Sequence, residues 1–92
     1  MAISAHFHHR GFTAAKYDEA IRRLDADGDG HPVGRLYHVA IDADGEIEVF
    51  DIWESQEALE KWGPEGFVPV LQELGVELLP PTFRPVYNVI EG

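Results

Sequence analysis

Apolar and polar residues alternate in four short segments of the chain, which predicts four β-strands. The first segment alternates Ile3, Ala5 and Phe7 with polar residues, and the last follows Pro80-Pro81. The second and third are separated by Asp42-Ala43-Asp44-Gly45, whose Asp and Gly residues are typical of a hairpin turn. The predicted strands are Ala2–His9, Leu36–Ile41, Glu46–Trp53 and Phe83–Ile90.

Two segments with helical periodicity lie between these strands. Ala14–Leu24 places its apolar residues on one stripe, and Thr13 is positioned to cap it. A second helix is expected after Ser55. Gly63-Pro64 and Pro69 should bend or split this helix, because proline lacks an amide donor and clashes with the preceding turn. Its apolar set is Leu59, Trp62, Phe67, Val70, Leu71 and Leu74.

The predicted order is βαββαβ, which indicates one α+β domain over residues 1–92 with a ferredoxin-like, four-stranded antiparallel sheet and two helices on one face. Three strands nevertheless carry large apolar residues on both faces. The face without helices must therefore be buried by something else, and a second copy of the chain is the expected partner in a homodimer. The residues concerned are Leu36, Tyr37, Val39, Ile47, Val49, Phe50, Ile52, Val86, Tyr87, Val89 and Ile90.

Charge and composition narrow the function classes. Seven Lys and Arg against seventeen Asp and Glu give a formal charge of -10, so neither nucleic acid nor an anionic membrane is an expected partner. The chain has no cysteine, which excludes disulfides, zinc–thiolate sites and thiol nucleophiles. No apolar run is long enough to span a membrane and no signal segment is evident, so we expect a complete, soluble, cytoplasmic protein.

Three segments resemble the dimeric α+β barrel superfamily, and within it the small antibiotic-biosynthesis-monooxygenase-like proteins of actinobacteria. The first is Leu36-Tyr37-His38-Val39-Ala40. The second is the junction Val49-Phe50-Asp51-Ile52-Trp53-Glu54-Ser55, followed by Ala58-Leu59 and Trp62. The third is Pro85-Val86-Tyr87-Asn88-Val89.

The resemblance implies a ligand cavity between the sheet and the subunit's own helices. The superfamily includes cofactor-free oxygenases of aromatic polyketides, haem-degrading enzymes, isomerases, dehydratases and proteins without known chemistry. Its haem-degrading members use a histidine of the second helix, whereas Phe67–Leu74 contains none and Gln72 is nearest to that position. Trp53 and Trp62 match tryptophans that are common in the superfamily, including pocket residues of the oxygenases.

His38 and Asp51 are the candidate catalytic residues. His38 lies in an otherwise apolar strand, where a buried imidazole needs a hydrogen-bond partner and is a candidate general base. Asp51 lies mid-strand on the same face as Trp53, and buried carboxylates are rare unless paired. Arg35, Arg84, Tyr37 or His38 could be that partner; His38 would make an acid–imidazole dyad. Otherwise Asp51 faces solvent or caps the second helix, and His38 only lines the pocket or core.

Two groups of residues raise the possibility of metal binding. Asp25-Ala26-Asp27-Gly28-Asp29-Gly30 matches part of an EF-hand calcium loop, but position 12 is Leu36 instead of a bidentate glutamate and position 8 is Pro32. A solvated acidic turn that holds at most an adventitious cation is therefore expected. His6, His8 and His38 could converge with His9 nearby, yet few carboxylates are available to complete a site, so no metal is predicted.

Aromatic residues are numerous enough to wall a pocket for a flat substrate, although plain core packing accounts for them equally well. Asn88 and Arg84 on the last predicted strand are weaker candidates for orienting a substrate carbonyl. The predicted substrate-binding residues are Tyr37, Trp53, Trp62, Phe67, Tyr87 and Asn88, and Tyr17 is a further aromatic candidate.

The leading hypothesis is a monooxygenase that uses no metal or flavin and acts on a small hydrophobic aromatic or polyketide-like compound. His38 would take a proton from a phenol or enol, and Asp51 would orient His38. The alternatives are a non-catalytic dimeric ligand-binding protein and an accessory domain that acts through its surface. Catalysis and ligand binding both require a cavity of roughly a few hundred cubic ångströms.

Overall fold

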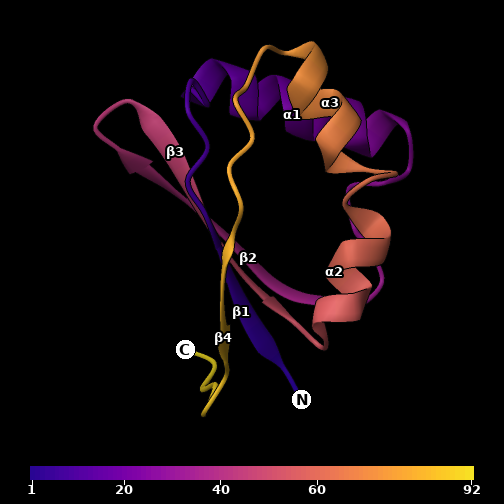
Figure 1. The fold of residues 1–92 in the computed structure, drawn as a ribbon, viewed down its shortest axis with the longest axis vertical. Helices are drawn as coiled ribbons and strands as arrows, with labels where there is room; N and C mark the ends of the chain where they lie inside the picture. The colour runs from indigo at the N-terminus through magenta and orange to yellow at the C-terminus, as the bar shows by residue number, and fades with distance from the viewer.

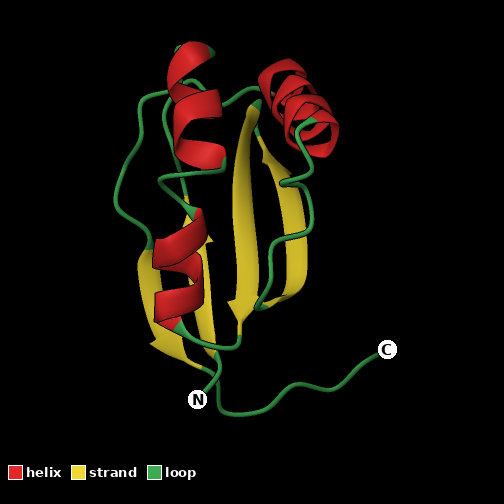
Figure 2. Ribbon diagram, turned by 90° about the vertical axis from the view of Figure 1, so that its right-hand side faces the viewer, coloured by secondary structure: helices red, strands yellow, loops and turns green.

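The protein is described by a computed structural model that covers residues 1–92. Its four strands pair antiparallel in the order β2-β3-β1-β4, which is the predicted ferredoxin-like arrangement. The helices cover one face of this sheet (Figures 1 and 2). No helix is long and apolar enough to cross a membrane. The elements are β1 (Ile3–Phe7), α1 (Ala14–Ala26), β2 (Arg35–Ala43), β3 (Glu46–Trp53), α2 (Gln56–Trp62), α3 (Phe67–Glu73) and β4 (Thr82–Pro85).

The β2–β3 hairpin is closed by the predicted Asp/Gly turn. Asp44 and Gly45 both have left-handed backbones, with φ of 56° and 100°. These are the conformations that a two-residue hairpin turn requires, and Asp and Gly adopt them at low cost. The side chain of Asp42 accepts a hydrogen bond from the amide of Gly45 at 2.9 Å. The turn therefore fixes the register that places β2 residues opposite β3 residues.

A β-bulge at Leu36 changes which β2 residues face the helices. Arg35 pairs with Trp53, but Tyr37 pairs with Ile52, so Leu36 is an extra residue on β2. Simple alternation would put Arg35 and His38 on opposite faces, because they are three residues apart. The bulge brings both onto the inner face, the one covered by helices, which is how bulges re-aim side chains near functional sites.

Side-chain caps begin the first two helices as predicted. Thr13 accepts from the amide of Lys16 and Ser55 from that of Ala58. The predicted second helix is split into α2 and α3 at Gly63–Gly66, where Pro64 lies. Pro69, in contrast, lies within α3 without breaking it. It is in the first turn, where amides lack intrahelical partners in any case.

The hydrophobic core fills the space between the inner sheet face and the helices. Trp53 is its only fully buried large side chain. The buried cluster consists of Ala5, Phe7, Phe12, Ala20, Leu24, Ile47, Val49, Trp53, Leu59, Val70, Leu71 and Val76. Every element except β2 and β4 contributes to it, so β2 is free to carry polar groups on its inner face.

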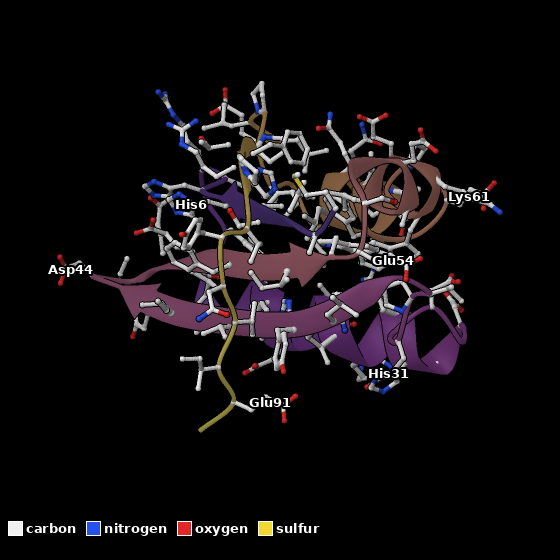
Figure 3. The ribbon with its side chains drawn as sticks, turned by 90° about the horizontal axis from the view of Figure 1, so that it is seen from below. His6, His31, Asp44, Glu54, Lys61 and Glu91 are labelled. Carbon is white, nitrogen blue, oxygen red and sulfur yellow. The ribbon has the colours of Figure 1, made fainter.

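The prediction of a strand over Phe83–Ile90 is mostly wrong, because β4 ends at Pro85. Residues 86–92 form a tail that continues past the sheet and returns toward β2, where the Tyr37 hydroxyl donates to the Glu91 carboxylate (Figure 3). The amide of Val86 donates to the carbonyl of Ala2 at 3.0 Å, and the apolar residues after Val86 belong to no strand. β1 is also shorter than Ala2–His9, because pairing stops at Phe7.

The outer face of the sheet, the one without helices, carries exposed apolar side chains. Leu36, Tyr37, Val39, Ile41 and Phe50 are each between 38% and 52% exposed. His6 stacks on Phe50 and its Nε2 lies 2.7 Å from the Glu48 carboxylate on this face. The apolar character of both sheet faces, expected from the sequence, is therefore present.

Candidate functional site

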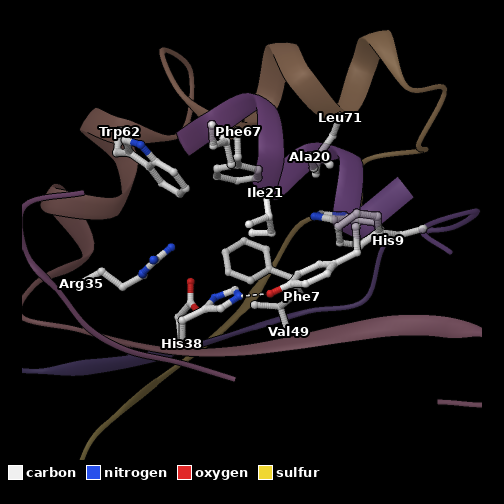
Figure 4. A pocket seen from close by; sticks show the side chains of 14 residues that line it. Phe7, His9, Ala20, Ile21, Arg35, His38, Val49, Trp62, Phe67 and Leu71 are labelled. Carbon is white, nitrogen blue, oxygen red and sulfur yellow. Dashed lines mark hydrogen bonds and ion pairs between the residues drawn. The ribbon is translucent and has the colours of Figure 1, made fainter. Parts of the chain in front are cut away.

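A partly open cavity lies between the inner face of the sheet and helices α1 and α3 (Figure 4). Its volume is about 60 Å³, which is smaller than the few hundred cubic ångströms expected for a ligand site. Most of the wall is apolar, and the polar groups are Tyr17, His9, Arg35, His38 and Asp51. The full lining is Phe7, His9, Phe12, Tyr17, Ala20, Ile21, Leu24, Arg35, His38, Val49, Asp51, Trp62, Phe67 and Leu71.

A chain of hydrogen bonds runs from α1 into the sheet along one wall of the cavity. The Tyr17 hydroxyl lies 2.7 Å from His38 Nε2, and His38 Nδ1 lies 2.7 Å from Asp51 Oδ1. The indole N–H of Trp53 donates to Asp51 Oδ2 at 3.2 Å. His38 and Asp51 are direct partners in the β2–β3 register, so the sheet itself holds them together. The dyad considered from the sequence thus exists as a contact.

These contacts fix the tautomer of the His38 imidazole. A carboxylate is acceptor-only, so Asp51 must receive Nδ1–H, and the lone pair of neutral His38 is then on Nε2. Tyr17 donates its O–H to that lone pair. Burial raises the pKa of the Tyr17 phenol, Arg35 opposes this rise and Asp51 adds to it. Tyr17 therefore remains a hydrogen-bond donor throughout the neutral range.

Asp51 is almost fully buried, and both of its carboxylate oxygens accept hydrogen bonds. It is 3% exposed, which for a carboxylate requires compensation by donors. His38 and Trp53 supply them. Trp53 itself is absent from the cavity wall: it lies behind Asp51 and packs against Trp62 with ring centroids 5.6 Å apart. Its position is that of a residue that supports Asp51, and direct contact between Trp53 and a substrate stays a prediction.

Trp62 and Phe67 form the aromatic wall of the cavity, at the end of α2 and the start of α3. Their ring centroids are 5.1 Å apart, and Phe67 meets Phe7 edge-on at 5.6 Å. Two glycines permit this packing. A Cβ on Gly63 would lie 3.2 Å from the Phe67 ring, and one on Gly66 only 2.4 Å from the Trp62 indole nitrogen. The Gly-Pro segment therefore also shapes the wall.

His9 lies on the opposite side of the cavity from Arg35 (Figure 4) and is 3% exposed. The amide of Leu79 donates to its Nδ1 at 2.9 Å. Burial lowers the pKa of His9, and the neighbouring His8 lowers it further. His9 is thus a neutral imidazole with its proton on Nε2. Nothing in the sequence distinguishes it from the other four histidines, because it lies just beyond the last paired residue of β1.

Arg35 enters the cavity because of the bulge at Leu36. Its guanidinium donates to the carbonyl of Gly30 at 2.9 Å and lies 5.8 Å from the centre of the Trp62 ring. The Trp62 indole N–H donates to the carbonyl of the adjacent Asp29 at 3.2 Å. Sequence reasoning considered Arg35 only as a partner of Asp51. Alternation assigns it to the wrong face, and no feature of the sequence marks the bulge.

Several predicted substrate-binding residues lie away from the cavity. Tyr37 faces outward on β2, and Tyr87 and Asn88 lie in the exposed tail after β4. Arg84 is exposed on the edge strand β4. None of these four residues lines the cavity of the single chain, and their contact with a substrate stays a prediction.

The histidines considered for a metal site do not converge. His6 is aligned with Phe50 on the outer face, whereas His38 is aligned with Asp51 on the inner face. His8 lies near Glu46, with 3.6 Å between its Nε2 and the carboxylate. In the acidic loop, Asp25 reaches Gly30, where a Cβ would collide with the Asp25 carboxylate.

The chain was compared with known proteins at three levels. No protein-family model matches it, and no curated protein matches by sequence. Solved structures do match over nearly the whole chain. The crystal structure of SnoaB, a cofactor-independent oxygenase from Streptomyces nogalater, superposes with a TM-score of 0.61 at 14% identity, over 99% of this chain and 96% of that one.

A second match is a crystal structure from Deinococcus radiodurans, of a protein provisionally named an antibiotic biosynthesis monooxygenase. Its TM-score is 0.62 at 17% identity, over 99% of this chain and 97% of that one. Identities this low establish the fold and leave the activity open. The chain therefore has the ferredoxin-like α+β fold of these two structures.

Proposed function

We propose that the protein is a cofactor-independent monooxygenase that acts on a small hydrophobic aromatic or polyketide-like compound. The observation that carries the proposal is the Tyr17–His38–Asp51 hydrogen-bond chain, which lies in the wall of an otherwise apolar cavity. Such a chain can take a proton from a bound phenol or enol and hold it. The two structures with this fold, an oxygenase and a provisionally named monooxygenase, support the same reaction class.

In this proposal, His38 is the general base and Asp51 holds it in the reactive tautomer. The Tyr17 hydroxyl is hydrogen-bonded to His38 Nε2, so the substrate hydroxyl either displaces it or passes its proton through it. Asp51 stabilises the imidazolium that forms, and Trp53 keeps the carboxylate in place. Trp62 holds the substrate ring.

Deprotonation makes the substrate electron-rich enough to transfer one electron to O₂. The resulting substrate radical and superoxide combine to form a C–O bond, and the peroxide takes the proton back from His38. Loss of water then leaves a ketone. For anthrone, the balance is anthrone plus O₂ giving anthraquinone plus H₂O, with O₂ accepting all four electrons. The protein supplies the base, the orientation and the exclusion of water.

A substrate of this size requires the cavity to widen. A second cavity of about 420 Å³ lies between α2, α3 and the segment before β4. It shares Phe7, His9 and Phe67 with the first, so these side chains form the partition between them. Displacement of the Phe67 ring would join the two spaces. The combined volume falls within the range of sites for drug-sized ligands, roughly 300 to 1,000 Å³.

The small volume of the first cavity, about 60 Å³, favours a second candidate function. In this alternative, the domain binds a small ligand without turnover, or acts through its surface, and the hydrogen-bond chain serves only to satisfy buried polar groups. The two functions differ in whether O₂ is consumed.

Oxygen uptake with anthrone tests the proposal. The wild-type protein is expected to consume one O₂ per anthraquinone formed, above the uncatalysed rate, and His38→Gln to lower the rate about a hundredfold or more. The matched control is His31→Gln, because His31 is exposed in a loop. Equal rates of oxygen uptake for the wild type and His38→Gln would contradict the proposal and favour the non-catalytic alternative.

We also propose that two chains associate through the outer sheet face to form a homodimer. The exposed apolar residues of β2 and β3 form one continuous surface. Light scattering should then give twice the 10.3 kDa mass of one chain. Val39→Glu should give the single-chain mass without unfolding, because Val39 is already 51% exposed in one chain. A wild-type protein of single-chain mass at micromolar concentration would refute the dimer.

A further inference from the structure

We infer that Arg35 recognises a carboxylate, and that the ligand of the cavity is a planar aromatic carboxylic acid. The inference rests on the proposed use of this cavity as the ligand site and adds a chemical class to it. It requires three things of Arg35: that it faces the cavity, that its donors are free, and that an aromatic surface lies beside it.

The bulge at Leu36 meets the first requirement. Arg35 pairs with Trp53, a residue of the inner face, and lines the cavity together with His38. Figure 4 shows the Arg35 side chain extending between His38 and Trp62. An arginine on the inner face of a small domain is costly to desolvate unless its charge is used.

The second requirement is met by the contacts of the guanidinium. Its one hydrogen bond within the protein goes to the Gly30 carbonyl, a neutral acceptor. Arginine has five N–H donors, so most of them remain available. Arg10, Arg22 and Arg23 all form ion pairs with carboxylates, but Arg35 forms none although the chain has seventeen acidic residues. A carboxylate ligand could accept two hydrogen bonds from the Arg35 guanidinium in a bidentate arrangement.

The only carboxylate in the cavity wall does not compete for this role. Asp51 is occupied by His38 and Trp53 through its two oxygens. Its charge is therefore compensated where it lies. The protein carries a net charge of -10, which repels anions in general, so any preference for an acid must come from a local group.

The third requirement is met by Trp62. Arg35 lies 5.8 Å from the centre of its ring, and Phe67 continues the aromatic wall. A flat ring held against Trp62 would place a carboxyl substituent at Arg35. The other edge of the same ring would face the Tyr17–His38 pair. Arg35 is thus a specificity residue, while His38 performs the chemistry.

Calorimetry with 2-naphthoate and 2-naphthamide tests the inference, because the two probes have nearly the same shape and differ in charge. The wild-type protein should bind the acid about tenfold more tightly than the amide, or better. In Arg35→Gln the two affinities should become equal, and in Arg35→Lys part of the preference should remain. Arg84→Gln is the matched control, because Arg84 is an exposed arginine without an ion pair.

The amide also reports on folding, because its binding should be unchanged in Arg35→Gln if only charge recognition is lost. Equal affinity of acid and amide for the wild type, an unchanged preference in Arg35→Gln, or no binding of either probe would overturn the inference. Oxygen uptake separates it from the proposed function. If the protein prefers the acid through Arg35 but does not oxidise anthrone, the inference about Arg35 stands and the proposed function fails. If it oxidises anthrone but shows no such preference, only the inference about Arg35 fails.

Discussion

His38 and Asp51 face each other across the β2–β3 pair, and the 2.7 Å contact between Nδ1 and Oδ1 sets the orientation of the imidazole. Neither residue comes from a loop. Both are held by a register that the Asp44-Gly45 turn fixes, so the catalytic geometry proposed for this site is a property of the sheet. The first prediction addresses this pair.

Replacement of Asp51 by asparagine should separate orientation from packing. The amide keeps the shape but can donate to Nδ1, which moves the His38 proton to Nε2 and removes the basic lone pair from the cavity side. We expect anthrone oxidation to fall by about a thousandfold or more, by analogy with other base–carboxylate pairs. The free energy of unfolding should fall by roughly 1–3 kcal/mol, measured by urea denaturation.

An Asp51→Asn protein that keeps full activity would show that the pair is structural. Glu48→Gln is the control, because Glu48 pairs with a histidine on the outer face, where no chemistry is proposed. Loss of activity in both variants would indicate a general effect on the sheet.

Tyr17→Phe should expose the role of the hydroxyl that occupies His38 Nε2. Burial raises the pKa of Tyr17, and the hydrogen bond to Glu91 raises the pKa of Tyr37, so both tyrosines should contribute to the high-pH part of an ultraviolet titration. The variant should lose the Tyr17 share of this high-pH component and keep that of Tyr37. A titration curve unchanged in shape would contradict the buried hydrogen bond. The stability cost should be about 1 kcal/mol.

The stability of the protein should decline in mild acid because of His9. Burial lowers the pKa of His9 in the folded state, so the unfolded chain takes up its proton first as the pH falls below about 6.5. The stabilisation is complete above that pH and is lost as the pH falls through the folded pKa. Protonation also leaves Nδ1 unable to accept from Leu79.

His9→Asn should flatten this dependence between about pH 7 and pH 5 in urea denaturation. One proton contributes at most about 1.4 kcal/mol for each pH unit. His31→Gln, which changes an exposed histidine, should retain the wild-type slope. If His9→Asn and the wild type decline in parallel, His9 is not the group responsible.

Phe67→Leu should test whether the partition between the two cavities opens. A smaller side chain makes the combined space easier to reach, so KM for anthrone should fall while kcat changes less. The matched control is Phe83→Leu, because Phe83 lines only the second cavity. A higher KM in Phe67→Leu alone would mean that the ring is a binding surface and does not act as a gate.

The sequence predicts the fold well because each element follows local rules. The hairpin turn at Asp44-Gly45 and the caps at Thr13 and Ser55 were all identified from residue type. The tail shows the limit of such rules, because Val86–Ile90 alternates as a strand does but makes no strand pairing beyond the Val86–Ala2 hydrogen bond. Pairing is a tertiary property that alternation alone cannot decide.

The candidate site was predictable in part for a similar reason. Polar residues in the middle of apolar strands pointed to His38 and Asp51, and their contact follows from the register. Arg35 could not be assigned to the cavity, because its face depends on the bulge at Leu36. His9 could not be singled out, because its burial depends on the packing of the segment around Leu79.

The measurement that most directly tests the account is oxygen uptake with anthrone by wild type, His38→Gln and His31→Gln at equal protein concentration. The account predicts stoichiometric anthraquinone formation by the wild type and His31→Gln, and a rate close to background for His38→Gln. Identical rates for all three proteins would contradict it, because the base in the cavity would then have no part in any oxidation.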